Sequence, residues 1–362
     1  MQQKLLLRLG IPTLAAGCLM MAALILTSGS LPGALLRLTE PANLQSFKIL
    51  FISIILEAFP FILLGVIFSA LLQAFVTDET IKKWTPKNPV AGVLFGGLLG
   101  IAFPLCECGM IPVVRRLIAK GMPAYIGIVY LLAGPIVNPV VFASTYSAFR
   151  LSPGIAYSRM AVAFTVAVII GLILSKWMKK SPLKHNESLV AHSPGHPGSR
   201  TRHIHEENGA GSSRSHVHSV QTAAKGRWRS KLTSVLSHSS DEFFEMGKYL
   251  IFGALLTAII QTAVDRSALA LFSDQPILSY MFMMGFAFIL SICSTSDAFI
   301  AASFSSLFQP GPLISFLVFG AMIDFKNTLM LLTTFKLKIV LLLIALTSVL
   351  TMAAAAIAEA FI

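Results

Sequence analysis

Long apolar segments recur along the whole chain and are separated by short polar stretches. They cover residues 11–27, 48–76, 90–105, 123–147, 154–175, 243–264, 278–293, 312–335 and 337–361. Several are longer than the roughly 20 residues that an α-helix needs to cross about 30 Å of hydrocarbon. The residue-by-residue alternation of a membrane β-barrel strand is missing. The pattern predicts an all-α, polytopic helical membrane protein.

Composition and charge agree with this prediction and narrow the location. Hydrophobic residues make up 55% of the 362 residues and charged residues only 12%, which is more apolar surface than a soluble core can bury. The net charge of +12 comes largely from Lys and Arg in one polar segment and at the ends of apolar segments. Cytoplasmic loops of membrane proteins have this distribution. We therefore expect the inner (plasma) membrane, with the lipid bilayer as partner, and no nucleic-acid binding.

Four parts can be distinguished along the chain. Residues 1–30 resemble a signal peptide, but the apolar run continues past the loose cleavage motif and favours a retained N-terminal transmembrane helix. Residues 178–240 are rich in Ser, Gly, Lys, Arg and His, which predicts a basic, disordered cytoplasmic linker. Two transmembrane repeats, 48–177 and 241–362, flank this linker.

The two flanking regions resemble one another in the order and spacing of their landmarks. Cys106 falls opposite Cys293 and Pro123 falls opposite Pro310, and further similar segments keep the offset between 184 and 187 residues. Any single match could arise by chance between apolar helices. Their common order favours an internal repeat.

A consistent topology follows if residues 90–120 and 278–309 each enter the membrane and turn back as a hairpin. The basic residues of both regions then lie inside, as the positive-inside rule requires. The two repeats become inverted relative to one another, a recurrent plan of transporters in which broken helices meet near the bilayer midplane. The sequence thus predicts two inverted repeats, each containing a re-entrant helical hairpin.

The first hairpin contains a Cys-x-Cys motif, Cys106-Glu107-Cys108, between Pro104 and Pro112. The prolines predict an irregular backbone, which is tolerated at membrane depth only inside protein or beside a wet cavity. Two thiols so close in sequence can face one ligand, and thiolates select soft species such as Cu(I), Zn(II) and trivalent metalloids. The alternative is that the cysteines are simply small buried apolar residues.

The second hairpin carries Cys293, followed by Ser294, Thr295, Ser296 and Asp297. The hydroxyl groups can coordinate a polar solute, or they can simply cap a broken helix. A carboxylate inside the membrane needs a partner or water, so Asp297 is a candidate for the substrate pathway.

Two further segments have polar breaks at corresponding positions, with Asn138 in the first repeat and Asp324, Lys326 and Asn327 in the second. Asp324 and Lys326 can partly neutralise one another, or they can line a pathway, where intramembrane ionisable groups are usually found. Glu57 is a further pathway candidate. We expect these residues and the two hairpin turns to share a water-accessible gap enclosed by protein.

All eight histidines lie in the linker. Two His-x-His pairs are weak candidates for metal binding: His203 and His205, and His216 and His218. Compositional drift in a disordered segment explains them equally well. Neither a phosphate-binding Gly-rich loop nor a Ser/His/Asp constellation is recognisable, so we expect neither an enzyme nor a bound cofactor.

Together, these motifs resemble those of the predicted permeases that include the organoarsenical efflux permeases. The shared residues are Glu57, Pro60, Phe61, Leu63, Gly65, Pro104, Cys106, Cys108, Gly109, Gly134, Pro135, Asn138 and Pro139, and later Cys293–Asp297, Gly320, Asp324, Lys326 and Asn327. The resemblance covers about residues 48–335 and implies a multi-pass plasma-membrane permease. It also implies export of trivalent methylated arsenicals, driven by an ion gradient.

The leading interpretation is a secondary transporter that moves a small thiophilic metal or metalloid species. The three hairpin cysteines would bind it, and the charged residues of the second repeat would compensate charge or couple protons. Alternatives are a zinc permease, a membrane thiol-redox component that cycles the Cys-x-Cys pair, and a membrane subunit that anchors a partner protein. A homo-oligomer is equally compatible with the sequence.

Overall fold

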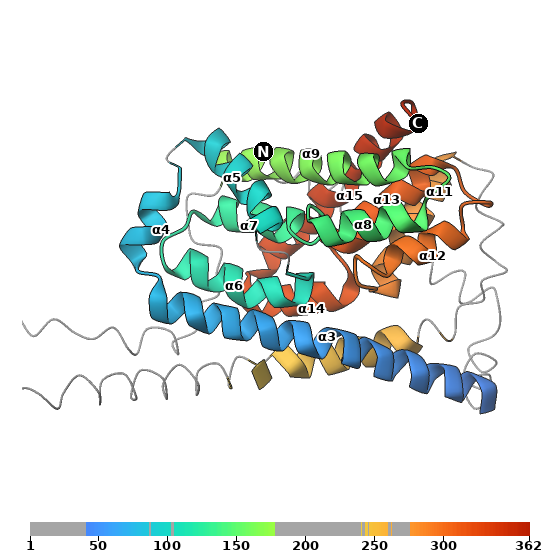
Figure 1. Cartoon of the computed structure of the whole chain (residues 1–362), viewed down its shortest axis with the longest axis horizontal. Helices are drawn as coiled ribbons and strands as arrows, with labels where there is room; N and C mark the ends of the chain where they lie inside the picture. The colour runs from blue at the N-terminus through green and yellow to red at the C-terminus, as the bar shows by residue number, and fades with distance from the viewer. Residues whose placement is uncertain are drawn as a thin grey trace, which may run out of the picture.

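The computed structural model describes residues 41–86, 88–102, 105–177, 240, 243–244, 246–259, 262 and 276–362. Its helices are α3 (Pro41–Phe75), α4 (Asp78–Trp84), α5 (Pro89–Ala102), α6 (Glu107–Ala119), α7 (Ala124–Ala133), α8 (Pro139–Ala148), α9 (Gly154–Trp177), α11 (Pro276–Leu290), α12 (Asp297–Ser303), α13 (Pro310–Met322), α14 (Phe325–Thr334) and α15 (Leu337–Glu359). A further helix, Met246–Ile259, carries no label in Figure 1. The regular structure of the described residues is helical, which confirms the all-α prediction. The N-terminal helix expected over 1–30 and the His-rich linker, apart from Ser240, lie outside these residues, so the four-part division stays a prediction.

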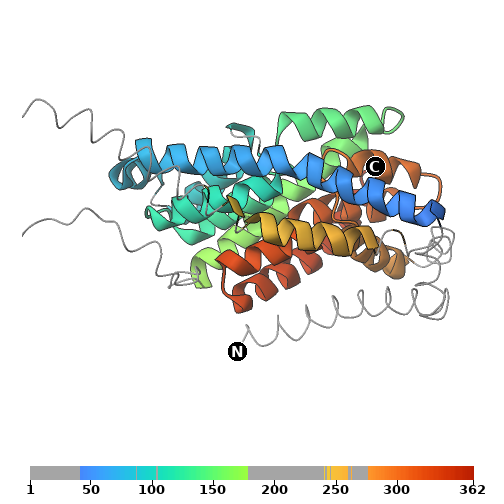
Figure 2. The same ribbon diagram turned by 90° about the horizontal axis from the view of Figure 1, so that it is seen from below.

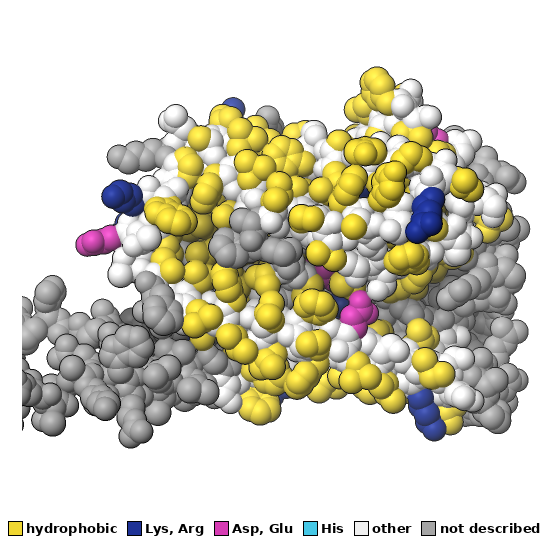
Figure 3. Space-filling view, viewed as in Figure 1, with side chains coloured by type: hydrophobic (Ala, Val, Ile, Leu, Met, Phe, Trp, Pro, Cys, Tyr) yellow, Lys and Arg dark blue, Asp and Glu magenta, His cyan; other side chains and the backbone are white. Residues whose placement is uncertain are grey.

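Four helical stretches are long and apolar enough to cross a membrane: Leu44–Leu72, Gly154–Trp177, Pro310–Thr334 and Leu337–Glu359. Their 23 to 29 residues exceed the roughly 20 that a bilayer requires. Figure 3 shows a mostly hydrophobic face, on which charged side chains lie mainly near the two ends. The chain is therefore a helical membrane protein, as its apolar segments predicted.

Several of the predicted membrane segments are interrupted. Asn138 separates α7 from α8 and caps α8, because its side chain accepts a hydrogen bond from the Val141 amide at 2.9 Å. Asp324 caps α14 in the same way and accepts a hydrogen bond from the Asn327 amide at 2.5 Å. Leu105 and Cys106 before α6 are also non-helical, and a short non-helical turn separates α11 from α12. The polar breaks recognised in the sequence are thus points where a helix stops and restarts.

The helices of the two halves pack in the same order (Figure 1). In the first half α5 contacts α7 and α7 contacts α9, and in the second half α11 contacts α13 and α13 contacts α15. The halves join reciprocally, since α6 packs on α14 and α12 packs on α8. One hydrophobic core includes residues of both halves. The turns that precede α6 and α12 therefore lie where the halves meet.

The α3 helix runs along the outside of this bundle and contacts α6 (Figure 2). A Cβ atom at Gly65 would lie 2.4 Å from the carbonyl oxygen of Gly109, so the close approach of the two backbones requires glycine. This contact brings Glu57, two turns earlier on α3, toward the start of α6.

The α5–α6 segment begins and ends at the same end of the molecule. Lys120, at the end of α6, donates hydrogen bonds to carbonyl oxygens at the end of α3, including that of Val76. The α4 helix follows there, and its Ile81 packs against Ile126. Ile126 is also the residue that a side chain at Gly92, near the start of α5, would meet. The start of α5 and the end of α6 thus lie at the same end of the molecule, and the re-entrant hairpin stays a prediction.

Candidate functional site

The first turn places two thiols and a carboxylate at the start of α6. Cys106 is the N-cap residue, and Glu107 and Cys108 open the helix. Glu107 and Cys108 are buried, with 3% and 2% of their surface exposed. The α6 helix continues through Pro112, so the prediction of an irregular backbone at that proline is wrong. The non-helical residues Leu105 and Cys106 come before the helix instead.

The second turn, residues 291–296, connects α11 with α12. Ser291 has a φ of 48°, a left-handed conformation that is uncommon for residues other than glycine. Thr295 donates a hydrogen bond to the Cys293 Sγ at 3.7 Å. Backbone strain of this kind persists where surrounding contacts enforce it, and it is frequent at functional sites.

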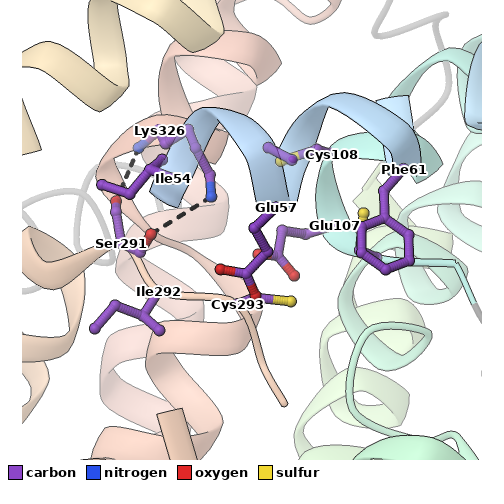
Figure 4. A pocket seen from close by; sticks show the side chains of 11 residues that line it. Ile54, Glu57, Phe61, Glu107, Cys108, Ser291, Ile292, Cys293 and Lys326 are labelled. Carbon is purple, nitrogen blue, oxygen red and sulfur yellow. Dashed lines mark hydrogen bonds between the residues drawn. The ribbon is translucent and has the colours of Figure 1, made fainter. Parts of the chain in front are cut away.

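The two turns, α3 and α14 line a small, partly open cavity of about 40 Å³, which is room for about three water molecules. It is lined by Ile54, Glu57, Ala58, Phe61, Cys106, Glu107, Cys108, Ser291, Ile292, Cys293 and Lys326. In Figure 4 the side chains of Glu57, Glu107 and Cys293 point into the same space. Six of the predicted pathway residues, three cysteines, two glutamates and one lysine, therefore share one cavity.

The cavity carboxylates accept hydrogen bonds from the second turn. Ser294 Oγ donates to Oε2 of Glu107, and Ser296 Oγ donates to Oε1 of Glu57, each at 3.2 Å. Ser296 precedes α12 without capping it through its side chain. The hydroxyls of Ser294 and Ser296 therefore connect the second turn to the first half. The alternative, that they only cap α12, is wrong for these two residues.

Lys326 brings a positive charge to the cavity. Its backbone amide donates to Ser291 Oγ at 3.1 Å, and its Nζ donates to the Ser291 carbonyl oxygen at 3.4 Å (Figure 4). Asp324 uses Oδ1 to cap α14, while its buried Oδ2 has no hydrogen-bond partner. No hydrogen bond joins Asp324 to Lys326, but their opposite charges still attract one another, which agrees with the partial neutralisation considered from the sequence.

Asp297 is paired with Arg159 of α9, a residue that the sequence pattern did not single out. Arg159 Nη2 lies 2.8 Å from Asp297 Oδ2 and also donates to the Ser294 carbonyl at 3.0 Å. Its Nη1 donates to Thr145 Oγ1 at 2.8 Å. Arg159 and Asp297 are only 1% and 4% exposed. The available signal was a lone arginine within an apolar span, since such a residue needs a buried partner.

Three predicted pathway residues lie at the helix breaks and do not line the cavity. Asn138 and Asp324 cap α8 and α14, and Asn327 Nδ2 donates to the Met322 carbonyl at 3.4 Å. The hydrogen bonds of Asn138 and Asn327 are local, whereas Asp324 also interacts electrostatically with Lys326 and Glu107 of the cavity.

The thiols do not form a preformed metal centre. Within the described ranges, no three His, Cys, Asp or Glu side chains are arranged to hold a metal ion together. Cys106, Cys108 and Cys293 are all free thiols. The two His-x-His pairs of the linker lie outside the described residues. The cavity thus brings thiol, carboxylate and ammonium groups together.

Comparison with known proteins agrees with a membrane transport role. The chain is 44% identical over 307 residues to the UPF0718 protein YcgR of Bacillus subtilis (strain 168), covering 85% of this chain and 95% of that protein. It is 35% identical over 301 residues to a Streptococcus mutans serotype c protein named as a two-component membrane permease complex subunit, covering 83% and 91%. No solved structure matches the chain. The ArsP_1 family, described as predicted permease, matches residues 43–360, and the chain belongs to this family of membrane permeases.

Proposed function

We propose that the chain is a secondary transporter whose substrate binds in the cavity between the two hairpin turns. The supporting observation is that thiols, carboxylates and an ammonium group from both halves line one space. A site between two packed units can open to either side when one unit rocks against the other. Both α6 and α14 begin beside this cavity, and helix N-termini stabilise negative charge on a bound solute.

We further propose that the halves are inverted repeats with re-entrant hairpins at α5–α6 and α11–α12. The α3 helix and the helix Met246–Ile259 lie side by side and run in opposite directions (Figure 2), and Phe59 contacts Phe243 edge to face at 5.2 Å. The reciprocal contacts of α6 with α14 and α12 with α8 are those expected of equivalent halves related by a twofold axis. In the plasma membrane, this topology would leave the linker 178–240 in the cytoplasm.

The proposed substrate is a small thiophilic metal or metalloid species, with a trivalent arsenical as the first candidate. Cys106, Cys108 and Cys293 all line the cavity, and thiolates prefer soft centres. A cavity of about 40 Å³ suits a species of few heavy atoms. The two glutamates and the lysine would balance its charge or that of a coupled ion.

Expression in a host that lacks its own metal and metalloid exporters tests this proposal. Cells with the chain should survive higher concentrations of trivalent methylarsenite and should contain less arsenic than cells with an empty vector. The double substitution Cys106→Ser and Cys108→Ser should abolish the effect, whereas Cys18→Ser, far from the hairpin motifs in sequence, should not. Equal arsenic contents with and without a normally inserted chain would contradict the proposed substrate.

Two alternatives remain for the same site. The His-rich linker favours a zinc permease, and parallel measurements of cell-associated zinc and copper separate this possibility from arsenical export. A thiol-redox component would cycle Cys106 and Cys108 through a disulfide, which would be strained and reactive at this spacing. Such a component should lose all activity without the thiols, while a transporter could still move harder solutes.

We also propose that the chain acts in a complex, with a second membrane protein or with further copies of itself. The Streptococcus mutans relative is named as a subunit of a two-component complex, and this chain would by analogy work with a partner or as a homo-oligomer. Purification of the tagged chain from its native membranes in mild detergent should recover a stoichiometric partner. Recovery of a functional, monomeric chain alone would contradict this part of the proposal.

A further inference from the structure

The turn between α11 and α12 is held from two sides. On the cavity side, Ser294 and Ser296 donate hydrogen bonds to Glu107 and Glu57. On the other side, the turn lies against α8 and α9 of the first half, which supply Ser144 and Arg159 as donors. The turn is non-helical, so its position depends on these external contacts.

Arg159 makes most of the contacts on the side away from the cavity. Nη2 of the guanidinium donates to both the Asp297 carboxylate and the Ser294 carbonyl, and Nη1 donates to Thr145 Oγ1. Ser144, the neighbour of Thr145 on α8, donates to the Thr295 carbonyl at 2.5 Å. A planar guanidinium can satisfy these acceptors together, whereas a lysine ammonium presents a single point charge.

One residue, Ser294, links Arg159 to the cavity. Ser294 accepts a hydrogen bond from Arg159 through its carbonyl and donates one to Glu107 through its hydroxyl. Cys293, the residue before it, lines the same cavity. Movement of the Ser294 backbone would therefore change the cavity wall, although Arg159 itself does not line it.

We propose that Arg159 is a positioning residue of the transport site. Through Asp297 and the Ser294 carbonyl, it holds the second turn so that Cys293 and the serine hydroxyls reach the cavity. The consequence for transport rests on the proposed function, whereas the position of the turn can be measured without any transport assay.

Labelling of Cys293 reports the position of the turn. The protein is the purified full chain with Cys18, Cys106 and Cys108 replaced by Ser, and the probe is N-ethylmaleimide. Arg159→Lys and Arg159→Gln should each raise the labelling rate by about tenfold, because loss of the contacts favours local opening of the turn. Glu359→Gln is the matched control, since Glu359 contacts Tyr280 between α15 and α11 and should leave the rate unchanged.

A second variant distinguishes loss of the turn contacts from misfolding of the protein. A buried charge that has lost its partner is strongly destabilising, so Arg159→Gln alone could reduce the yield of folded protein. The double variant Arg159→Gln with Asp297→Asn removes both charges and should fold better, yet its Cys293 should still label rapidly. Wild-type labelling rates in this double variant and in Arg159→Lys would overturn the proposal, as would an equal increase in Glu359→Gln.

Transport measurements distinguish failure of this inference from failure of the proposed function. With all native cysteines present, Arg159→Lys should raise the KM for methylarsenite uptake into inside-out vesicles more than it lowers Vmax. A wild-type chain that moves no methylarsenite would contradict the proposed substrate and leave the labelling result standing. Normal transport together with unchanged labelling in Arg159→Lys would contradict the positioning role alone.

Discussion

Glu107 Oε2 accepts a hydrogen bond from Ser294 Oγ at 3.2 Å, and this contact joins the start of α6 to the turn before α12 across the interface between the halves. In the proposed repeat, Cys106 falls opposite Cys293, so Glu107 falls opposite Ser294. Two equivalent residues can touch only close to the axis that relates their halves. The contact therefore puts the proposed axis beside the cavity, where both halves can reach a bound solute.

Ser294→Ala should destabilise the protein because it removes the hydrogen-bond donor of the buried Glu107 carboxylate. Glu107 is 3% exposed, and a buried acceptor that loses its donor costs about 1–3 kcal/mol. Thermal unfolding of the purified protein in detergent should show a lower midpoint than for the wild type. Ser303→Ala is the control, because its exposed hydroxyl bonds only to the Ile300 carbonyl within α12. Equal midpoints for the two variants would argue against an energetic role for the Glu107 contact.

Gly65→Ala should weaken the packing of α3 on α6. The added Cβ would meet the Gly109 carbonyl at 2.4 Å, and since backbone cannot rotate away, the helices must separate at a cost of about 1–3 kcal/mol. Gly247→Ala provides the comparison, because a Cβ built there meets no side chain or neighbouring element of the described residues within 4 Å. The fraction of monodisperse protein after graded heating should fall for Gly65→Ala and stay unchanged for Gly247→Ala. The opposite ranking would contradict the close approach of α3 and α6.

Much of the cavity wall could be predicted from the sequence because its residues carry local signals. The Cys-x-Cys motif marked the start of α6, and the cluster around Cys293 marked the second turn. Asn138, before a proline, and Asp324 marked the points where helices restart. Such signals depend on residue types within a few positions of one another, and the local structure follows from them.

The contacts between the halves could not be predicted in the same way. Glu57 and Ser296 are 239 positions apart, and Arg159 and Asp297 are 138 positions apart. Whether a polar residue in an apolar helix lines a cavity, caps a helix or pairs with a charge depends on how that helix is rotated against its neighbours. Composition and periodicity do not determine this rotation for helices that are apolar on most faces. For that reason the sequence does not reveal that Asp297, a candidate for the substrate pathway, forms an ion pair with Arg159.

Substitutions of Asp324 should separate its capping role from its charge. Asp324→Asn retains an oxygen that can accept the hydrogen bond from the Asn327 amide, so the thermal midpoint should stay close to that of the wild type. Asp324→Ala removes the cap and should lower stability by about 1 kcal/mol. If Asp324→Asn were as unstable as Asp324→Ala, the carboxylate charge would be the stabilising feature instead.

The proposed hairpins predict opposite accessibility for two positions at their ends. Arg116 lies in the last turn of α6, and Gln309 immediately precedes α13. In a background without native cysteines, a membrane-impermeant maleimide added to intact cells should label Gln309→Cys. Arg116→Cys should stay unlabelled until the membrane is disrupted, because a re-entrant α5–α6 segment returns to the cytoplasmic side.

Two exposed positions calibrate this accessibility measurement. Lys82→Cys, in the amphipathic α4 helix, marks the cytoplasmic side, and Leu151→Cys, 101% exposed between α8 and α9, marks the outside. Labelling of Arg116→Cys in intact cells while Lys82→Cys stays protected would mean that α5 and α6 together cross the membrane. The two halves would then have the same orientation in the membrane. Transport by rocking of one inverted repeat against the other would be contradicted.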